Sequence, residues 1–298
     1  MCQLVQVSRA GFYRHWQERA PDEEEMAVRA AIQEIALGHR CYGRPRVTHA
    51  LRQRGMVVNH KRVGRIMQED NLLAIRRRKF LLTTDSRHDY PVYLNLAARM
   101  TLSGINQLWI ADVTYIRLRG EFLYLAVVLD RYSRKVIGWA VGRKFTTELV
   151  LRALQQAVAQ RRPPAGVVHH SDRGVQYCSR EYVEALEANR MTGSMSRPAN
   201  PYDNAACESF MKTLKQEEIY CNAYRDLDDL SAHLEEFIER YYNRLRLHSA
   251  LGYRTPEQFE ADLKGEPAKS SPDAATMRLF TPPDQDATDA GKNDSSSA

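Results

Sequence analysis

The stretch LWIADVTYIR at residues 108–117 decides the fold of this 298-residue chain, because it predicts a strand with one acidic residue inside it. β-Branched and aromatic residues fill the run, as is typical of strands that pack against a core. Asp112 stands in the middle, between Trp109 and Tyr115. A carboxylate in such surroundings is costly to bury unless it is used, so the sequence marks Asp112 as a functional residue.

Two more strand-like runs follow, FLYLAVVLD at residues 122–130 and RKVIGWAV at residues 134–141. Their connections are short, so the three runs predict an antiparallel meander, with Asp130 as a turn residue. The pattern further predicts a helix over residues 147–159, a strand over 166–170, a helix over 180–189 and a strand over 193–196. This order predicts an α/β protein in which helices flank a mixed sheet.

Two further acids form a candidate constellation with Asp112. Asp172 directly follows the predicted strand 166–170, so adjacent strands would bring it near Asp112. Glu208 lies in a predicted helix that Asp203 can cap after the breaker-rich loop 197–201. Spacing alone would not identify the pair, since a chain with 37 Asp and Glu residues contains such separations by chance. The helix has an apolar stripe (Cys207, Phe210, Met211, Leu214) and an opposite polar stripe (Asn204, Glu208, Lys212, Lys215).

Three carboxylates on rigid elements suit metal-dependent phosphodiester chemistry. Hard oxygen ligands favour Mg²⁺ or Mn²⁺. Two such ions about 3.5 to 4 Å apart would activate a nucleophile and stabilise a leaving oxygen, so the sequence predicts two ions per active site. Without ions the three acids would repel one another.

The N-terminal part of the chain is strongly basic. Residues 39–79 contain twelve Lys and Arg against two acids, a local net charge of +10, whereas the whole chain carries +6. Periodic apolar residues there predict a helix-turn-helix, with Gly55 as a stop and Asn59 as the N-cap of the second helix. That helix would present Lys61, Arg62 and Arg65 to solvent.

The basic residues predict contact with DNA phosphates through this second helix and the run that follows it. The predicted contacts there are Lys61, Arg62, Arg65, Arg76, Arg77, Arg78 and Lys79. On the polar stripe of the helix that contains Glu208, Asn204, Lys212 and Lys215 are predicted to contact DNA as well. A small helical packing domain with a merely solvated basic face remains the alternative.

Other features limit the class of protein. No apolar run approaches the ~18 residues of a membrane span, and the N-terminal residues lack the pattern of a secretory signal, so we expect no membrane partner and a cytoplasmic location. The five cysteines are scattered and odd in number, which predicts free thiols. His169 and His170 could bind a metal ion or DNA, but the favoured interpretation is that each is a strand-end histidine satisfied by a backbone partner.

Several sequence blocks resemble one known family. WIADVTY at residues 109–115, HSDRGVQY at 170–177 and PYDNA at 201–205, continued by Glu208 and Lys215, resemble the integrase core of bacterial insertion-sequence transposases of the OrfB type. VSRAGFY at 7–13, YGRPR at 42–46 and LGYRTP at 251–256 are similar to the flanking parts of the same group. The resemblance covers roughly residues 7 to 260. It implies the ribonuclease H-like fold shared with retroviral integrases.

The resemblance implies that Asp112, Asp172 and Glu208 are the catalytic acids of a DDE transposase, and that Lys215 touches DNA near them. The implied reaction is strand cleavage by water at the end of the element. The freed 3′ hydroxyl then attacks a second phosphodiester, without ATP or a covalent enzyme intermediate. The implied partners are double-stranded DNA, both element ends and target, further copies of the chain on that DNA, and an upstream OrfA-type partner fused by frameshifting. A circular form of the element is also implied.

We therefore predict four parts along the chain. Residues 1–80 form a helical, basic, helix-turn-helix-like region, and residues 81–100 a linker. Residues 101–262 form the integrase-like catalytic core with a C-terminal helix. Residues 263–298 form an acidic tail with too little apolar surface to order itself.

Two rival functions differ from this prediction. A nuclease of the ribonuclease H class would cut RNA in hybrids and never join ends. A DNA-binding regulator would keep the core only as a scaffold, and the loss of an acid would indicate it. No acid is missing from the three candidate positions.

Overall fold

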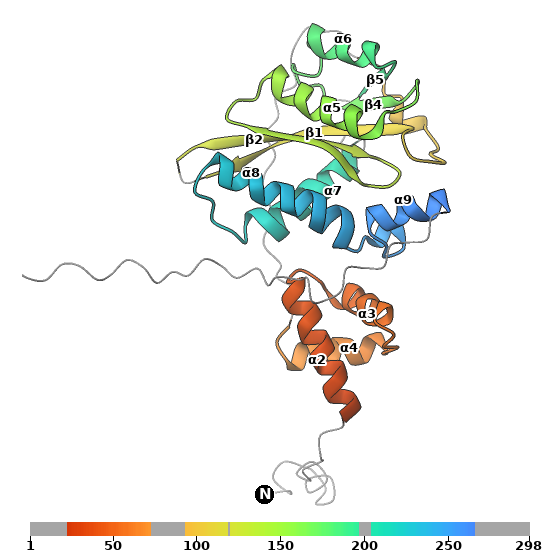
Figure 1. The fold of residues 1–298 in the computed structure, drawn as a ribbon, viewed down its shortest axis with the longest axis vertical. Coiled ribbons are helices and arrows are strands. Elements are labelled where there is room, and N and C mark those ends of the chain that lie inside the picture. Colours follow the sequence, from red (N-terminus) through yellow and green to blue (C-terminus); the bar gives the residue numbers. More distant parts are fainter. Residues whose placement is uncertain (1–22, 73–92, 119, 197–203, 266–298) are drawn as a thin grey trace, which may run out of the picture. The chain divides into compact units, whose positions relative to one another are not determined.

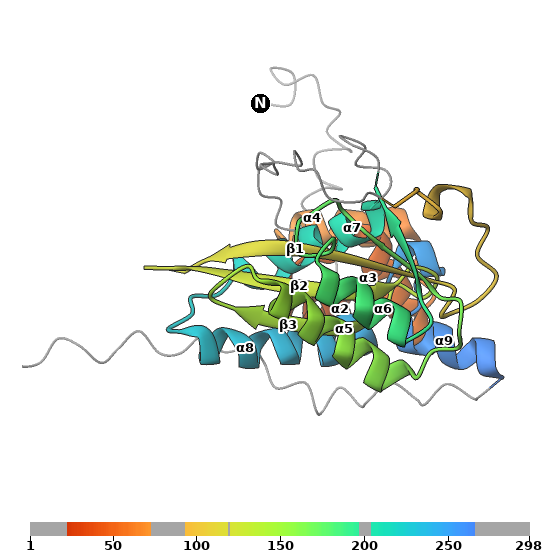
Figure 2. The same cartoon turned by 90° about the horizontal axis from the view of Figure 1, so that it is seen from above.

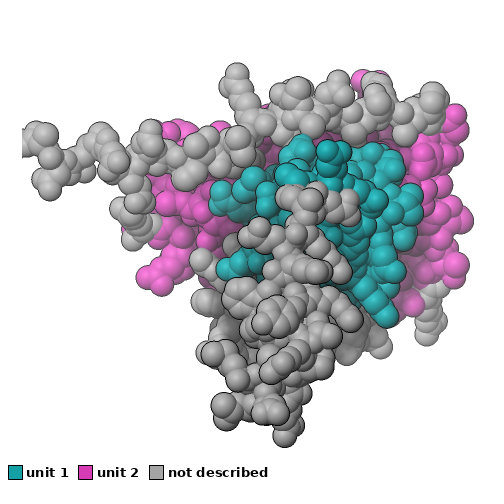
Figure 3. Space-filling model, turned by 90° about the horizontal axis from the view of Figure 1, so that it is seen from below, with its two compact units in different colours: residues 1–76 teal, residues 77–298 magenta. Residues whose placement is uncertain are grey.

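The computed structural model describes residues 23–72, 93–118, 120–196 and 204–265. The chain divides into two compact units, residues 1–76 and 77–298, which Figure 3 colours separately. The predicted cap Asp203, the basic run from Arg76 to Lys79 and the acidic tail from residue 266 on lie outside the described residues. The predicted four-part domain scheme stays a prediction.

The first unit consists of the helices α2 (Glu23–Gly38), α3 (Arg44–Gln53) and α4 (His60–Glu69). They enclose a small core of buried side chains: Val28, Ile32, Ile35, Val47, Leu51, Val63, Ile66 and Met67. Gly55 has a φ of +79° between α3 and α4. The Asn59 side chain accepts a hydrogen bond from the Lys61 backbone N–H at 2.8 Å, which caps α4. The predicted helix-turn-helix is confirmed.

The second unit is built on a five-stranded sheet in the order β3-β2-β1-β4-β5. The strands are β1 (Leu108–Arg117), β2 (Phe122–Asp130), β3 (Val136–Gly142), β4 (Val168–Ser171) and β5 (Thr192–Met195). β1, β2 and β3 form the predicted antiparallel meander, whereas β1, β4 and β5 run parallel. The predicted mixed sheet is confirmed.

The third strand begins two residues later than the sequence predicts. Arg134 has a φ of +59° and belongs to the turn before it. Buried Asp130 organises this turn, since its carboxylate accepts hydrogen bonds from the backbone N–H groups of Asn106, Tyr132 and Ser133 at 2.6 to 3.1 Å. The interpretation of Asp130 as a turn residue is confirmed.

Helices cover both faces of the sheet (Figure 1). One face carries α5 (Thr147–Arg161) and α6 (Arg180–Ala188). The other carries α7 (Ala205–Leu214), the π-helical turn η3 (Lys215–Ile219), α8 (Leu227–Glu235) and the π-helical η4 (Glu236–Leu245). Short 3₁₀ turns η1 (Ala97–Arg99) and η5 (Ser249–Leu251) and the helix α9 (Pro256–Lys264) complete this unit. A separate hydrophobic core fills the space on each side of the sheet.

The sheet is wide at one end and narrow at the other. β4 pairs with β1 only from Leu108 to Ile110, whereas β2 pairs with β1 as far as Arg117. The β1–β2 hairpin therefore extends beyond β4 (Figure 2). Asp112 lies on β1 just beyond the residues that pair with β4, at the base of this hairpin.

Candidate active site

The parallel pairing of β1 and β4 brings Asp112 and Asp172 to the same level of the sheet. Ile110 is the register partner of His170, and each acid follows its strand's partner residue by two positions. The Asp112 carboxylate accepts a hydrogen bond from the Val113 N–H at 2.9 Å. The Asp172 carboxylate accepts one from the Gly174 N–H at 3.0 Å. The two acids are thus held by short local contacts at neighbouring strand ends.

Glu208 enters from α7, which packs against β1. Four buried residues form the packed stripe of the helix, as the sequence predicts: Cys207, Phe210, Met211 and Leu214. The Cys207 thiol lies 3.6 Å from the Ile110 carbonyl oxygen, to which it donates. Glu208, the next residue, is exposed. Packing of α7 therefore carries Glu208 to the part of β1 that contains Asp112.

The charges of Asp172 and Glu208 both act on the carboxyl group of Asp112. Burial, followed by the negative charge of Asp172, raises the pKa of Asp112 to about 7. The charge of Glu208 also raises this pKa, whereas the Val113 hydrogen bond and the charge of Lys215 lower it. Partial burial raises the pKa of Glu208. The surroundings of Asp112 therefore disfavour its charged form.

The three carboxylates interact without forming a ready ion cage. Among the described residues, no three His, Cys, Asp or Glu side chains stand close enough together to hold a metal ion. Their chemistry nevertheless fits a hard divalent cation, because every donor is a carboxylate oxygen and Asp112 is destabilised by the other two charges.

Two lysines, Lys212 near the end of α7 and Lys215 at the start of η3, lie in different environments. Lys215 is half-buried, and its ammonium lies 5.1 Å from the centroid of the Tyr115 ring. Burial lowers the pKa of Lys215 and the charge of Asp112 raises it. Lys212 is exposed. The structure thus brings Lys215, rather than Lys212, to β1 beside the acids.

Asn204 does not lie on the exposed polar stripe that the sequence predicts. It has a non-helical backbone at the start of α7, with φ −119° and ψ 23°, and its side chain is buried. Its Nδ2 donates to the Ala111 carbonyl oxygen at 3.4 Å. The helical spacing fails here because Asn204 precedes the first helical residue, so its side chain turns toward β1.

The two histidines of β4 have local partners. His170 lies between Ser194 and Ser196 of the β5 segment, at 2.9 and 3.0 Å from their hydroxyl oxygens. His169 shares a hydrogen bond of 3.0 Å with the Tyr182 hydroxyl. Both histidines thus have hydrogen-bond partners nearby, but these partners are side chains, whereas the sequence predicted a backbone partner.

A connection that the sequence does not reveal joins the Asp172 loop to β5. The Arg173 guanidinium donates to the Ser196 carbonyl oxygen at 2.9 Å, and the Ser196 N–H donates to the Ser171 carbonyl oxygen at 2.9 Å. Residues 171–174 are therefore anchored on the side facing β5. The only signal in the sequence is the HSDRG motif itself, whose arginine has no predictable partner.

The basic residues of α4 are partly neutralised by acids of α2. Arg62 lies 2.9 Å from a Glu24 carboxylate oxygen and 3.7 Å from one of Glu25, and Arg65 lies 3.5 Å from Glu25. Lys61 is exposed. Of the three predicted DNA contacts on α4, Arg62 is the least exposed, since it packs toward α2.

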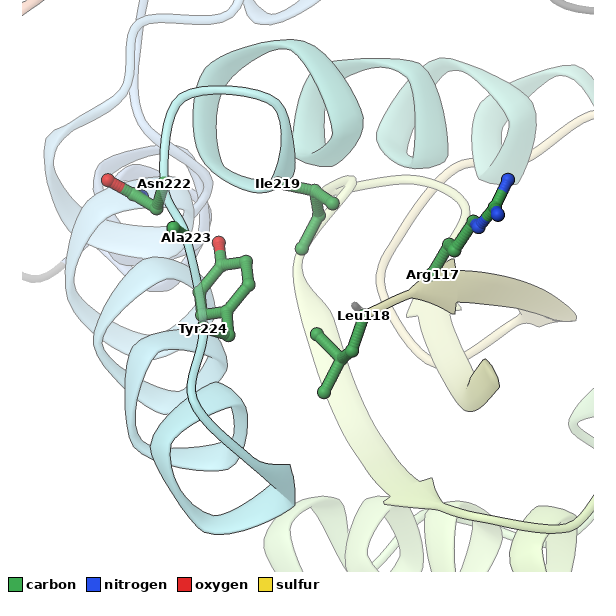
Figure 4. A pocket seen from close by; sticks show the side chains of 6 residues that line it. All are labelled: Arg117, Leu118, Ile219, Asn222, Ala223 and Tyr224. Carbon is green, nitrogen blue, oxygen red and sulfur yellow. The ribbon is translucent and has the colours of Figure 1, made fainter. Parts of the chain in front are cut away.

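The structure also contains a cavity away from the acids. Arg117, Leu118 and Ile219 face Asn222, Ala223 and Tyr224 across a space of about 360 Å³ (Figure 4). None of the three carboxylates lines it.

Comparisons with known proteins agree with this arrangement. Integrase core domain models match residues 103–201 and 189–256, and an HTH-like domain model matches residues 22–80. The chain is 38% identical over 264 residues to the insertion element IS600 uncharacterized 31 kDa protein of Shigella sonnei, covering 87% of this chain and 97% of that protein. It is also 38% identical over 266 residues to the transposase InsF for insertion sequence IS3A of Escherichia coli (strain K12), covering 87% and 92%.

Solved structures to which the chain is similar include two from viruses. One is a chain of the simian T-cell lymphotropic virus intasome in complex with PP2A regulatory subunit B56 gamma, with 21% identity, a TM-score of 0.45 and coverage of 63% of this chain and 64% of that chain. The other is the HTLV-2 integrase catalytic core domain in complex with magnesium, with 20% identity, a TM-score of 0.41 and coverage of 52% and 96%.

No helix in the described parts of the chain is long and apolar enough to span a membrane. The two core-domain matches together span the whole sheet and α7, and the HTH-like match spans α2 to α4. Identity of 38% extends over nearly the full length of the curated relatives. The chain therefore belongs to the IS3 family of insertion-sequence transposases, polynucleotidyl transferases of the DDE class that act in DNA transposition.

Proposed function

We propose that Asp112, Asp172 and Glu208 are the catalytic acids of this transposase. The observation that carries the proposal is the electrostatic coupling of Asp112 to both other acids, which contributes to a pKa of about 7. A carboxyl group whose pKa is raised by burial and by the charges of two neighbouring acids is typical of a functional site.

The integrase family depends on a divalent metal ion, and the three acids provide oxygen ligands suited to Mg²⁺ or Mn²⁺. We propose two ions per active site, held by Asp112, Asp172 and Glu208. Such ions activate the attacking oxygen and stabilise the leaving oxygen. Asp112 loses its proton when they bind, because cations reverse the repulsion that raises its pKa.

The other residues of the site orient the DNA. Lys215 contacts a phosphate next to the scissile bond, because it is half-buried at the start of η3 and the charge of Asp112 raises its pKa. Lys212 contacts the strand farther out. Asn204 acts indirectly, because its amide fixes the start of α7 to Ala111 and so positions Glu208.

The first unit binds the duplex through α4, with Lys61 and Arg65 on phosphates and Arg62 released from its ion pairs on binding. The run from Arg76 to Lys79 adds contacts to the DNA backbone. Residues 1–80 then form the DNA-contacting region, 81–100 the linker, 101–262 the catalytic core and 263–298 the tail.

The reaction we propose has two steps at one site. Water cleaves a strand at the end of the element, and the freed 3′ hydroxyl attacks a phosphodiester of the target or of the other end, which gives a circular form. Joining two ends requires several copies of the chain on DNA. An upstream OrfA-type partner, fused by frameshifting, supplies recognition of the ends.

The test measures cleavage and joining on an end-labelled duplex with Mg²⁺. Asp112→Asn, Asp172→Asn and Glu208→Gln each remove one ligand charge, and each is expected to lower both products by at least ~1,000-fold, the scale of losing a major transition-state contact. Glu184→Gln, on the exposed side of α6, is the matched control and is expected to leave both products unchanged.

A binding measurement complements the rate. Titration of Mn²⁺ into the wild-type chain with bound DNA is expected to give two ions per chain, and Asp112→Asn is expected to bind fewer. Wild-type joining by any of the three variants would contradict the proposal. Cleavage confined to RNA in hybrids would support the ribonuclease H-class alternative, and binding without any cleavage or joining would support the regulator.

A further inference from the structure

Two large aromatic rings are exposed on the β1–β2 hairpin. Phe122 is 51% exposed and Tyr115 is 40% exposed. Their ring centroids are 6.0 Å apart at an interplanar angle of 71°, so the rings meet edge to face. Folding gains little hydrophobic free energy from rings that stay in solvent, whereas a ligand that covers them would gain it on binding.

The register of the hairpin explains why these rings share one face. Arg117 is the partner of Phe122 and Tyr115 is the partner of Tyr124, and residues two apart on a strand point to the same side. Tyr124 in turn stacks on Phe145, with centroids 5.8 Å apart and an angle of 19°. These four residues (Phe122, Tyr115, Tyr124 and Phe145) are called the aromatic row.

The aromatic row reaches both sides of the candidate active site. At one side, the Lys215 ammonium lies over the Tyr115 ring, and Lys215 senses the charge of Asp112. At the other, the Phe145 carbonyl oxygen accepts a hydrogen bond of 3.2 Å from Gln176, in the loop that contains Asp172. The row is therefore linked to the site by Lys215 and by the loop that contains Asp172, although Tyr115 and Asp112, three residues apart, point to opposite sides of β1.

Positive charge accompanies the rings. The Arg117 guanidinium carbon lies 5.8 Å from the centroid of the Phe122 ring, next to the Lys215–Tyr115 contact. Alternating rings and cations are the features with which proteins bind single-stranded nucleic acid, since rings stack on bases and cations contact phosphates. The charge of the row thus complements DNA, whereas a second apolar protein surface would leave these cations unpaired.

We propose that the aromatic row, with Arg117 and Lys215, binds an unpaired nucleotide of the DNA strand that occupies the active site. The rings can stack only on a base whose faces are free, and in a duplex these faces are stacked on neighbouring bases. The proposal rests on the proposed function in one respect, that the scissile phosphate lies at Asp112.

The length of β1 between the acid and the aromatic row limits where this nucleotide can lie. Asp112 and Arg117 are five residues apart on β1, or about 17 Å at ~3.3 Å per residue. DNA advances ~3.4 Å per nucleotide along one strand of a duplex. The row therefore covers positions within about five nucleotides of the scissile phosphate, which requires local opening of the duplex there.

The test compares DNA binding of full-length variants in the Asp112→Asn background, without divalent metal, so that no DNA is cleaved. The probes are a blunt duplex and the same duplex with about five unpaired nucleotides at one end, followed by fluorescence anisotropy. Phe122→Ala and Tyr115→Ala are each expected to weaken binding of the frayed probe about tenfold, and binding of the blunt probe less than twofold.

Conservative variants and a control make the result specific. Phe122→Trp and Tyr115→Phe keep a ring and are expected to bind the frayed probe like the parent, which separates stacking from misfolding. Leu263→Ala removes a 48% exposed apolar residue from α9 and is expected to change neither affinity. Unchanged binding in both alanine variants, or an equal loss on both probes, overturns the proposal. Because no step depends on catalysis, the outcome is independent of whether the three acids are catalytic.

Discussion

Arg246 and Glu217 form a buried bidentate ion pair, in which both nitrogen-to-oxygen distances are 2.8 Å. The Tyr241 hydroxyl donates to the same carboxylate at 2.9 Å. Glu217 lies in η3, two residues beyond Lys215, and Arg246 directly follows η4. The pair therefore fixes the π-helical turn that carries Lys215 toward β1.

Removing one partner of this pair leaves a buried charge without compensation. Arg246→Met is expected to lower the free energy of unfolding by about 3 to 5 kcal/mol, and the double variant Arg246→Met with Glu217→Leu by less. Urea denaturation of both variants measures the difference. Arg240→Ala, which breaks the exposed 2.9 Å pair with Glu236, is the control and is expected to cost at most about 1 kcal/mol. A double variant that is less stable than Arg246→Met would contradict this account.

The two lysines of the α7 segment are expected to differ in strand transfer. Lys215 lies beside Tyr115 and senses Asp112, whereas Lys212 is exposed three residues earlier. Lys215→Ala is expected to lower the joining rate at saturating DNA at least ~10-fold, equivalent to ~1.4 kcal/mol of barrier. Lys212→Ala is expected to weaken DNA binding slightly without this effect. Single-turnover joining rates decide, and equal rates for both variants would count against the assignment.

Gly138 on β3 is required for the close approach of α5. A Cβ at this position would lie 2.2 Å from the Ala153 carbonyl oxygen and 2.8 Å from the Ala157 backbone nitrogen. Since both atoms belong to backbone, Gly138→Ala forces α5 away from the sheet and is expected to cost at least about 1 to 3 kcal/mol. Gly120→Ala meets no atom within 4 Å and is the control. Thermal melting that gives both variants the same Tm would refute the argument.

His169 makes the stability of the fold depend on pH. Burial, and then the neighbouring His170, lowers the pKa of His169 from 6.5 to about 3. Between these values the unfolded chain binds a proton that the folded chain does not, so the free energy of unfolding falls as the pH drops below about 6.5. The slope approaches ~1.4 kcal/mol per pH unit.

A variant isolates this contribution from those of other groups. His169→Gln retains a hydrogen-bonding partner for Tyr182 and does not titrate. Urea denaturation at pH 7, 6 and 5 is expected to show a shallower loss of stability for the variant than for the parent. Identical slopes would mean that His169 takes up its proton equally well in both states.

Acids of α2 are expected to restrain DNA binding by α4. Glu25 lies 3.5 Å from Arg65 and 3.7 Å from Arg62, so Glu25→Gln removes one negative charge beside both cations, although Arg62 keeps its pair with Glu24. Duplex affinity is expected to rise several-fold at low salt, and the gain should shrink as salt screens the charges. Glu34→Gln removes an α2 acid that pairs with Arg54 of the α3 turn instead, and is the control. A gain of the same size in both variants would show only the change in net charge.

The sequence by itself determines the elements and their order in this transposase. β1 and β2 have the predicted bounds, and α4 begins after the predicted cap Asn59. Local causes suffice for these, because β-branched runs, turns and caps act over a few residues. The resemblance of the motif blocks also identified the family, which the comparisons confirm.

Only the tertiary structure decided which polar and charged side chains contact one another. Asn204 turned inward because it precedes the helix, and Arg62 paired with Glu24, 38 residues away, because α2 packs beside α4. The coupling of Asp112 to Asp172 and Glu208 arises from the pairing of β1 with β4 and the packing of α7. Helical and strand periodicities predict which side of an element a residue faces, but the partner on that side depends on contacts between segments distant in sequence, which only the packed fold determines.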